Sequence, residues 1–385
     1  MERNVTLDFV RGVAILGILL LNIVAFGLPK AAYLNPAWSG RVSDSDAWTW
    51  AILDLLAQVK FLTLFALLFG AGLQLLLPRG KRWIQSRLTL LALLGFIHGL
   101  LFWDGDILLA YALVGLVSWR MVREAHDAKS LFNTGVVLYL IGVAVLVLLG
   151  LISGNTPNRS WVPDAANVQY EQFWKLNGGF EAVRNRADML SDSLLALGAQ
   201  YGWQLAGMML MGAALMRSGW LKGQFSLRHY RCAGALLIIV GMAINLPSIF
   251  TQWHLGWDYR WCAFLLQAPR EISAPLQTIG YAALAWGFWP QLCKLRLAAA
   301  IACVGRMALS NYLLQTLICT TLFYRFDLFM KFDRLSLLAF VPPIWTVNLL
   351  FSWLWLRHFR QGPVEWLWRQ LTCRASGTSL KDTSR

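Results

Sequence analysis

Long apolar runs recur along the whole chain, and they constrain its fold more than any other feature. A helix of about 20 apolar residues matches the roughly 30 Å hydrocarbon core of a bilayer. Of the 385 residues, 57% are hydrophobic and only 14% are charged, which is more apolar surface than a soluble core would bury. We therefore predict an all-α, polytopic transmembrane helical bundle of about ten helices. The predicted spans cover residues 10–28, 52–77, 88–103, 107–119, 131–152, 197–216, 232–250, 272–289, 298–323 and 335–356.

The basic residues of the loops predict an orientation. Arg79, Lys81 and Arg82 lie in one loop, and every second loop after it is again rich in lysine or arginine. Because such loops stay on the cytoplasmic side, both termini are predicted to be cytoplasmic. Residues 1–357 form the predicted transmembrane domain, whose long loop 153–196 is periplasmic with room for a short helix over the membrane mouth. Residues 358–385 are predicted to be a cytoplasmic amphipathic helix followed by a disordered tail.

Composition and spacing argue against several classes of function. The net charge of +14 is spread over short loops and forms no single patch, so we expect no nucleic-acid partner. The six cysteines show no CxxC spacing, and no HExxH pattern is present, so we expect no metal. Walker, dinucleotide and GxSxG patterns are also absent from the sequence.

Two predicted spans share one layout of polar residues. Arg11 is followed eleven residues later by Asn22, and Arg87 is followed eleven residues later by His98. Eleven residues span about 16 Å of helix and bring both members to nearly the same face. Each span would therefore carry an arginine at its cytoplasmic edge and a hydrogen-bonding side chain deeper in the membrane. The alternatives are that Arg11 pairs with Asp8 while Asn22 packs between helices, and that His98 bonds a backbone carbonyl.

His98 is the candidate catalytic base, because imidazole transfers protons near neutral pH. Asp104 and Asp106 follow it in the connection between the third and fourth spans, and either carboxylate would orient the imidazole. A capping role at the start of the fourth span is an equal alternative for Asp106.

Other polar residues inside predicted spans are candidate ligands of an anionic group. Lys60 is predicted either to extend to the periplasmic face or to point inward to such a group. Arg306, with Asn311 and Gln315 beyond it in the ninth span, suggests a cradle for phosphate or pyrophosphate. Arg306 would alternatively pair with Asp104 or another acid.

Five segments together resemble the YeiB family of bacterial inner-membrane proteins over nearly the whole chain. The segments are TLDFVRGVAILGILLLN, FALLFGAG, RLTLLALLGFIHGLLFWDGDILLAYA, VGRMALSNYLLQT and GPVEWLWRQLT. The resemblance implies a multi-pass protein of the bacterial inner membrane. The first segment also resembles the wider transmembrane acyltransferase superfamily, which includes heparan-alpha-glucosaminide N-acetyltransferase and the acyltransferase-3 enzymes.

Only some functional residues of the acyltransferase superfamily have a counterpart in this sequence. In acyltransferase-3 proteins a required histidine follows the arginine or lysine by eleven positions, where this sequence has Asn22. The heparan enzyme has asparagine there and a catalytic histidine in the next loop, near the position of Asn35 in this chain. The resemblance thus implies pocket roles for Arg11 and Asn22, and it leaves the base unassigned unless His98 supplies it.

The expected function is transfer of an acyl group from cytoplasmic acyl-CoA, such as acetyl-CoA, to a sugar or glycolipid on the periplasmic side. Arg11, Arg87 and Arg306 would hold the CoA phosphates, His98 would deprotonate the acceptor, and Asn22 would stabilise the oxyanion. One alternative is a transporter or flippase of a small anionic metabolite with His98 as proton relay. Another is a membrane subunit that binds a partner through residues 153–196. The expected partners are the lipid bilayer and these small molecules, and a homodimer is left open.

Overall fold

The computed structural model describes residues 4–378, and the described residues are helical with connecting loops. Short 3-10 and π turns, labelled η, join or extend the α-helices. The elements are α1 (Val5–Gly27), η1 (Lys30–Tyr33), α2 (Asp44–Leu56), α3 (Lys60–Leu76), η2 (Leu77–Arg79), α4 (Lys81–Leu101), α5 (Leu108–Glu124), α6 (Ala128–Ile152), α7 (Ala165–Asn177), α8 (Gly179–Ala196), η3 (Leu197–Tyr201), α9 (Gly202–Arg217), η4 (Trp220–Lys222), α10 (Leu227–His254), α11 (Tyr259–Cys262), η5 (Leu265–Gln267), α12 (Ala268–Gly287), α13 (Trp289–Leu292), α14 (Arg296–Arg306), α15 (Ala308–Thr320), η6 (Thr321–Arg325), α16 (Arg334–Leu338), α17 (Val341–His358) and α18 (Pro363–Ser376).

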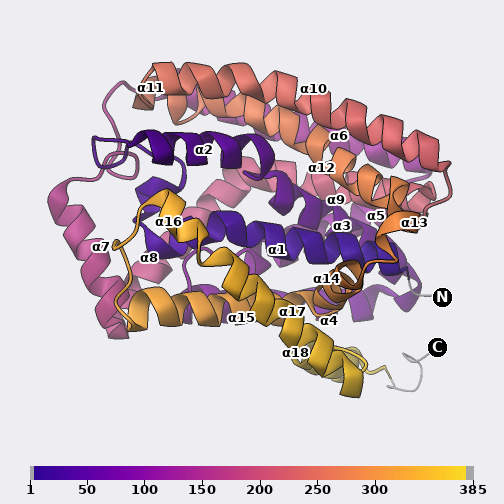
Figure 1. The fold of residues 1–385 in the computed structure, drawn as a ribbon. Helices are drawn as coiled ribbons and strands as arrows, with labels where there is room; N and C mark the ends of the chain where they lie inside the picture. The colour runs from indigo at the N-terminus through magenta and orange to yellow at the C-terminus, as the bar shows by residue number, and fades with distance from the viewer. Residues whose placement is uncertain (1–3, 379–385) are drawn as a thin grey trace.

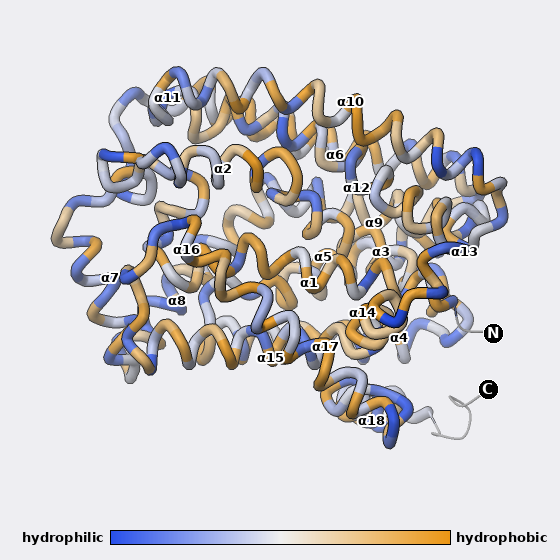
Figure 2. Tube along the Cα trace, viewed as in Figure 1, coloured by the Kyte–Doolittle hydropathy of each residue, from blue (hydrophilic) through white to orange (hydrophobic). Residues whose placement is uncertain are grey.

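The long helices run roughly along one axis, so the molecule has two ends (Figure 1). Helices α7, α11 and α16 lie at one end, which we call the arm end. Helices α13, α14 and α18 lie at the other, which we call the basic end because Lys81 and Arg82 begin α4 there and Arg217 ends α9 there. Helix α1 begins at the basic end as well. Figure 2 shows hydrophobic residues along the helices and hydrophilic residues gathered toward both ends.

The helices have the length and composition of membrane spans. Within residues 4–378, six helical segments are long and apolar enough to cross a bilayer, with Asp44–Arg79 taken as one of them, or up to seven if a bent pair counts as one span. The fold therefore agrees with the predicted helical membrane protein, while the count of ten crossings and the placement of both termini stay predictions. Helices α5 and α9 have only 17 and 16 residues, and α12 carries Arg270 and Glu271 in its first turn.

The predicted second span (52–77) is interrupted at residues 57–59, between α2 and α3. Val59 adopts a φ of 68°, which is strained for a β-branched residue. Carbonyl groups freed near the break find side-chain donors: the Lys60 ammonium bonds the Asp54 carbonyl at 2.5 Å, and the Tyr281 hydroxyl bonds the Leu56 carbonyl at 2.9 Å. Such substitutes allow a helix to break at membrane depth.

The predicted ninth span (298–323) is wrong as a continuous helix. Helices α14 and α15 meet at Met307 with a bend of 90°. The Glu365 carboxylate accepts bonds from the amides of Leu309 and Ser310 at 2.8 and 3.1 Å, which satisfies the exposed start of α15. The Asn311 side chain bonds the Met307 carbonyl at 2.9 Å. Apolar periodicity continues through this break, so the hydropathy pattern did not reveal it.

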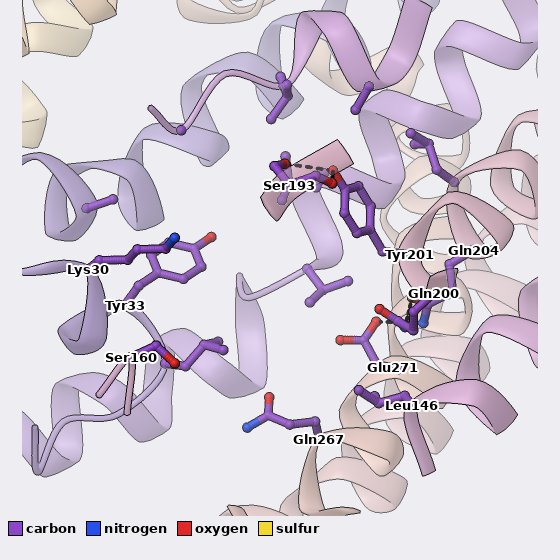
Figure 3. A pocket seen from close by; sticks show the side chains of 18 of the residues that line it. Lys30, Tyr33, Leu146, Ser160, Ser193, Gln200, Tyr201, Gln204, Gln267 and Glu271 are labelled. Carbon is purple, nitrogen blue, oxygen red and sulfur yellow. Dashed lines mark hydrogen bonds between the residues drawn. The ribbon is translucent and has the colours of Figure 1, made fainter. Parts of the chain in front are cut away.

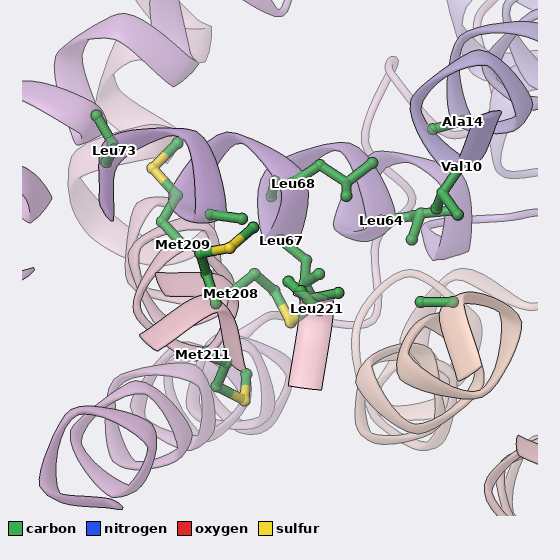
Figure 4. Close-up of a cluster of buried hydrophobic side chains, with 14 of the residues drawn as sticks. Val10, Ala14, Leu64, Leu67, Leu68, Leu73, Met208, Met209, Met211 and Leu221 are labelled. Atoms are coloured by element: carbon green, nitrogen blue, oxygen red, sulfur yellow. The ribbon is translucent and has the colours of Figure 1, made fainter. Parts of the chain in front are cut away.

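The packed interior centres on α1, α3 and α9. Figure 4 shows Leu64, Leu67 and Leu68 of α3 beside Met208 and Met209 of α9. The contact requires small residues, since a β-carbon on Gly212 would lie 1.8 Å from the Leu67 carbonyl oxygen. Unbranched methionine fills the irregular space that remains between the two helices.

Two segments outside the bundle match their predictions in part. The long loop 153–196 holds two helices, α7 and α8, where we predicted room for one short helix. They join at Gly178 and Gly179, whose φ values of 67° and 69° allow the sharp elbow. Helix α18 lies within the predicted amphipathic segment, and the predicted disordered tail lies mostly outside the described residues.

Candidate functional site

A cavity of about 700 Å³ lies in the half of the bundle nearer the arm end. Elements from the arm end form much of its wall: η1, the connection between α4 and α5, α7, α8 and η3. Figure 3 shows Lys30 and Tyr33 on one side of the open space and Gln200, Gln204 and Glu271 on the other. Further aromatic rings line the cavity, namely Trp103, Tyr111, Tyr139, Trp161, Tyr201, Tyr259 and Phe264. The arrangement suits a polar molecule with apolar faces.

His98 and Asp106 form a buried pair beside this cavity. The imidazole Nδ1 lies 2.7 Å from Asp106 Oδ1, and Nε2 lies 3.1 Å from the Thr316 hydroxyl on α15. Asp106 Oδ2 also accepts a bond from the Leu109 amide at 3.0 Å, so this residue orients the imidazole and caps α5 at once. Asp106 lines the cavity, whereas His98 lies behind it in the wall. The carboxylate is therefore the member of the pair nearer to a bound molecule.

Two other predicted residues reach the cavity. Asn22 lines it from α1, and Asp104 lines it from the turn before α5. Asp104 acts electrostatically on Lys175 and Arg186 in the helix pair α7 and α8, which we call the α7–α8 arm. Of the two candidate carboxylates, Asp106 bonds His98 and Asp104 faces the arm. Asn35, in the loop that follows η1, bonds the Trp161 carbonyl and is fully buried.

A buried cluster of four charged side chains adjoins the cavity, and we did not predict it as a unit. Arg270 Nη1 lies 3.0 Å from Asp54 Oδ2, and Nη2 lies 3.5 Å from Glu271 Oε1. Gln204 donates to the other Glu271 oxygen at 3.1 Å. Lys60 is fully buried against the Asp54 carbonyl, so of its two predicted positions it takes the inward one. Two positive and two negative groups balance formally in this cluster.

The sequence held a signal for this cluster. Asp54 lies inside the predicted second span, and it met the same criterion as Lys60 for a functional residue. Arg270 and Glu271 lie just before the predicted start of the eighth span at residue 272, so the sequence prediction places them in a loop. The helix begins at Ala268, which places both charges inside the bundle. An error of a few residues in one boundary thus concealed half of the cluster.

The α7–α8 arm is fixed to the bundle by ionic and aromatic contacts. The Lys175 ammonium lies 2.8 Å from Glu171 Oε1 and 4.9 Å from the centre of the Phe329 ring. Burial alone would lower the pKa of Lys175, but Glu171, Tyr324 and Asp104 offset it and raise the pKa above the usual range. The lysine therefore keeps its charge at all physiological pH values, and it forms part of the cavity wall.

The predicted arginines gather at the basic end, far along the helices from the cavity. The Arg87 guanidinium lies 3.5 Å from the centre of the Trp368 ring and 5.2 Å from that of Trp83. Arg11 is close enough to act on it electrostatically and bonds Asp8 at 3.2 Å, as the alternative for Arg11 predicted. Arg306 ends α14 and bonds the Arg360 carbonyl at 2.6 Å. Arg87 and Arg306 thus contact α18 and the connection that precedes it, and Arg11 lies near Arg87.

Asn311 and Gln315 have other partners than a ligand. The Asn311 amide nitrogen bonds the Ser352 hydroxyl at 2.7 Å, and Asn348 donates to the Asn311 oxygen at 2.9 Å. Gln315 donates to Asn348 at 3.3 Å and to the Ile15 carbonyl at 3.4 Å. Both side chains are buried, so these amides hold α15 against α1 and α17.

Comparison with known proteins gives relatives over the full length. A family model described as "Protein of unknown function (DUF418)" matches residues 215–375. The chain is 75% identical over 385 residues to the Escherichia coli protein described as "Uncharacterized protein YeiB", with all of both chains covered. It is 30% identical over 404 residues to "Uncharacterized protein YxaH" of Bacillus subtilis, covering 96% of this chain and 94% of that one. No solved structure matches. Identity at this level over the whole of both sequences confirms the predicted resemblance, and the chain belongs to the YeiB family.

Proposed function

We propose that the protein is a membrane acyltransferase that moves an acyl group from cytoplasmic acyl-CoA to a sugar or glycolipid on the periplasmic side. The observation that carries the proposal is the cavity wall, where Asp106 is held by His98 and Asn22 lies on a neighbouring helix. In this proposal ten segments cross a bacterial inner membrane, the basic end is cytoplasmic, and the arm end is periplasmic.

The Asp106–His98 pair acts as the base in this reaction. The acceptor gives up the proton of its hydroxyl or amine to the pair, and its oxygen or nitrogen attacks the thioester carbonyl. Asn22 donates a hydrogen bond to the oxyanion of the tetrahedral intermediate. The carbon–sulfur bond then breaks, and the CoA thiolate takes the proton that the Asp106–His98 pair received from the acceptor, which restores the pair. Because Asp106 lines the cavity, it contacts the acceptor and His98 acts through it.

The donor is held at the opposite end. Arg11, Arg87 and Arg306 bind phosphate oxygens through charge-assisted hydrogen bonds. From Arg11 to Asn22 the first helix rises about 16 Å, which separates the phosphate groups from the reacting thioester. Acetyl-CoA is the simplest donor of this kind.

The acceptor lies among aromatic rings and amides. Tyr111, Tyr139 and Tyr201 present flat apolar faces, while Gln200 and Gln267 present hydrogen-bonding groups. Sugars combine these two kinds of surface, with hydroxyls at the ring edge and C–H groups on its faces. The balanced charges of Asp54, Lys60, Arg270 and Glu271 leave the nearby wall without net charge, which favours a neutral acceptor.

The second candidate function is a transporter of a small anionic metabolite. The interrupted helix at Val59, with buried charges on either side, favours it, because discontinuous helices bind substrates in several transporter folds. In this case Arg270 and Lys60 would contact the anion, and His98 would relay a proton.

Inside-out membrane vesicles supplied with radiolabelled acetyl-CoA test the enzyme. We expect label in a lipid or glycan product, with transfer reduced at least about 100-fold in His98→Ala and Asp106→Asn. His126→Ala and Asp327→Asn are matched controls at exposed positions and should keep full transfer. Folding of each variant is checked by gel filtration in detergent.

Purified protein that binds no acetyl-CoA, or transfer that persists in both cavity variants, contradicts the proposal. Acid-stimulated uptake of a metabolite into proteoliposomes without a covalent product would support the transporter instead. Arg87→Gln should raise the KM for acetyl-CoA about tenfold with little change in kcat, because it contacts the donor away from the reacting carbonyl.

A further inference from the structure

Helix α18 has one face fixed to the bundle and one face turned away from it. On the inner face, Glu365 bonds the start of α15, Trp368 donates to the Arg87 carbonyl at 2.9 Å, and Thr372 and Cys373 are buried. Figure 1 shows the helix lying outside the bundle at the basic end, beyond α4 and α17. The orientation of α18 is therefore set by the protein, and its outer face has a fixed direction.

The outer face of α18 is apolar. Trp366 and Leu367 are each 50% exposed, and Leu371 is 39% exposed. At 100° per residue these three positions, with Arg374 between them, form one stripe along the helix. Large apolar groups are costly to keep in water. A stripe of tryptophan and leucine at the edge of a membrane-spanning bundle is typical of a helix that lies in the bilayer interface.

The charge around this stripe has one sign. Residues 341–376 contain four arginines and a single carboxylate, Glu365. That carboxylate is turned inward and occupied by the start of α15. Arg357, Arg360 and Arg374 are exposed, and the Arg357 guanidinium lies 3.4 Å from the centre of the exposed Trp353 ring. An arginine stacked on an interfacial tryptophan lies at the depth of lipid headgroups.

We propose that α18 and the end of α17 form a docking surface for anionic phospholipid, whose headgroups contact Arg357, Arg360 and Arg374 while Trp366, Leu367 and Leu371 enter the acyl region. Apolar burial and attraction to anionic headgroups reinforce each other in such helices. Basic residues near a negatively charged leaflet attract it strongly, whereas a neutral lipid offers them only dipoles. This surface is separate from the cavity and does not depend on the proposed acyl transfer.

The docking has a consequence for the basic end. The same helix that would bind the lipid also stacks Trp368 on Arg87 and caps α15 with Glu365. Anionic lipid would hold α18 in this position, and a neutral bilayer would let it open more often. The lipid surface thereby controls access to Arg87.

Hydrogen–deuterium exchange of residues 363–376 tests the proposal in lipid nanodiscs. One preparation contains phosphatidylcholine alone, and the other contains equal parts of phosphatidylcholine and phosphatidylglycerol. We expect exchange in this segment to be about tenfold slower with phosphatidylglycerol. The triple variant R357Q/R360Q/R374Q should lose that difference, and it spares every inner-face contact.

A matched variant, R120Q/R123Q/R228Q, removes three exposed charges from α5 and α10 at the same end, whereas α18 packs against α4 and α15. It should keep the full difference between the two lipids. Equal exchange in the two nanodiscs would overturn the proposal. So would loss of the difference in the matched variant, because general attraction of the basic end would then explain it. Protection of the segment only by a bound protein would overturn it as well.

Discussion

The buried cluster beside the cavity and the arginines of the basic end compensate charge in different ways. In the cluster, Arg270 lies between Asp54 and Glu271, so its positive charge meets two carboxylates. At the basic end, Arg87 stacks on tryptophan rings, and Arg217 donates to the carbonyls of Ala125 and Val122. Carboxylates balance the first region, and rings and peptide dipoles stabilise the second.

The difference follows from what surrounds each region. A charge away from water is costly unless an opposite charge accompanies it, so the interior cluster is neutral as a whole. At the end of the bundle, aromatic rings and peptide carbonyls accompany the guanidinium groups of Arg87 and Arg217 without cancelling their charge, so this region keeps a net positive charge. We infer that the cluster fixes the structure, while the basic end remains available to phosphate groups.

The largest expected effect is in the cluster. Arg270→Met removes the cation that contacts both buried carboxylates and should lower the free energy of unfolding by about 3–5 kcal/mol. Unfolding in detergent by added dodecyl sulfate measures the change. Arg374→Met, at an exposed position, should change it by less than about 0.5 kcal/mol.

A double variant sharpens this prediction. Asp54→Asn removes one of the two carboxylates that Arg270 contacts, so the double variant should recover at least about 1 kcal/mol. If the reductions in unfolding free energy of the two single variants simply add, the carboxylate and the guanidinium do not compensate each other. The proposed difference between the cluster and the basic end would then be wrong.

The second-largest effect is expected in the α7–α8 arm, where loss of the Lys175 contact should make the cavity wall more accessible to a labelling reagent. Lys175→Met removes the buried ammonium that fixes α7, so a cysteine introduced at Ser193 in the cavity wall should react with a polar maleimide about tenfold faster. Lys331→Met is the matched control, because Lys331 forms an exposed i, i+4 pair with Asp327. An unchanged rate in Lys175→Met would show that this contact does not close the arm.

The pH dependence of the same labelling follows from the raised pKa of Lys175. A raised pKa makes the contact fully present below the pKa of a free lysine and weakens it only at more alkaline pH. Once corrected for the reactivity of the thiol itself, the opening rate should stay constant from about pH 6 to about pH 9. Faster opening within that interval would contradict the assignment.

Arg87 at the basic end should contribute less to stability than Arg270. Arg87→Gln removes the stacking on Trp368 and should cost about 1 kcal/mol in the same unfolding measurement. Arg87→Lys should recover little of it, because an ammonium lacks the flat face that stacks on a ring. A loss of unfolding free energy in Arg87→Gln as large as that in Arg270→Met would contradict the proposed difference between the cluster and the basic end.

The smallest expected effect is a difference in alkylation between two cysteines, one at each end of the molecule. Cys262, at the arm end, is fully buried, and burial together with Asp258 raises the pKa of its thiol to about 12. At about pH 8 it is therefore protonated and unreactive. Cys293, after α13 at the basic end, is exposed. Mass spectrometry after alkylation of the folded protein should find Cys293 modified and Cys262 unmodified, and equal modification would contradict the burial.

The sequence predicted the helical membrane fold and several contacts, because apolar length and helical spacing are local properties. The spacing from Arg87 placed His98 about 16 Å further along α4, in its last turn, and Asp106 was correctly one of the two candidate partners of the imidazole. What local pattern could not provide is where a helix breaks. The interruptions at Val59 and Met307 depend on distant groups, Tyr281 for the first and Glu365 for the second.

The polar cluster shows a second limit. Within its own segment each charge is a boundary residue or an isolated exception. Only the tertiary fold, which brings Arg270 of α12 to Asp54 of α2, makes the two residues partners. Opposite charges in different spans, taken as pairs, predict such a cluster better than each charge does alone. The predicted phosphate cradle of Arg306, Asn311 and Gln315 assumed one continuous helix. The 90° bend at Met307 and the other partners of the two amides leave Arg306 as the one member of that group that stays a candidate phosphate ligand.

The contact between α1 and α14 has a consequence for biogenesis. A β-carbon on Gly305 would lie 1.8 Å from the Asp8 carbonyl oxygen, so the first helix is completed by residues made nearly 300 positions later. At a synthesis rate of about 5–20 residues per second, α1 waits roughly 15 to 60 s for this partner. Helix α1 is apolar enough to enter the bilayer alone. The surface that packs against α14 stays uncovered until residue 305 has been synthesised. A ribosome that stalls before residue 305 would release a chain whose first helix is inserted and unfinished.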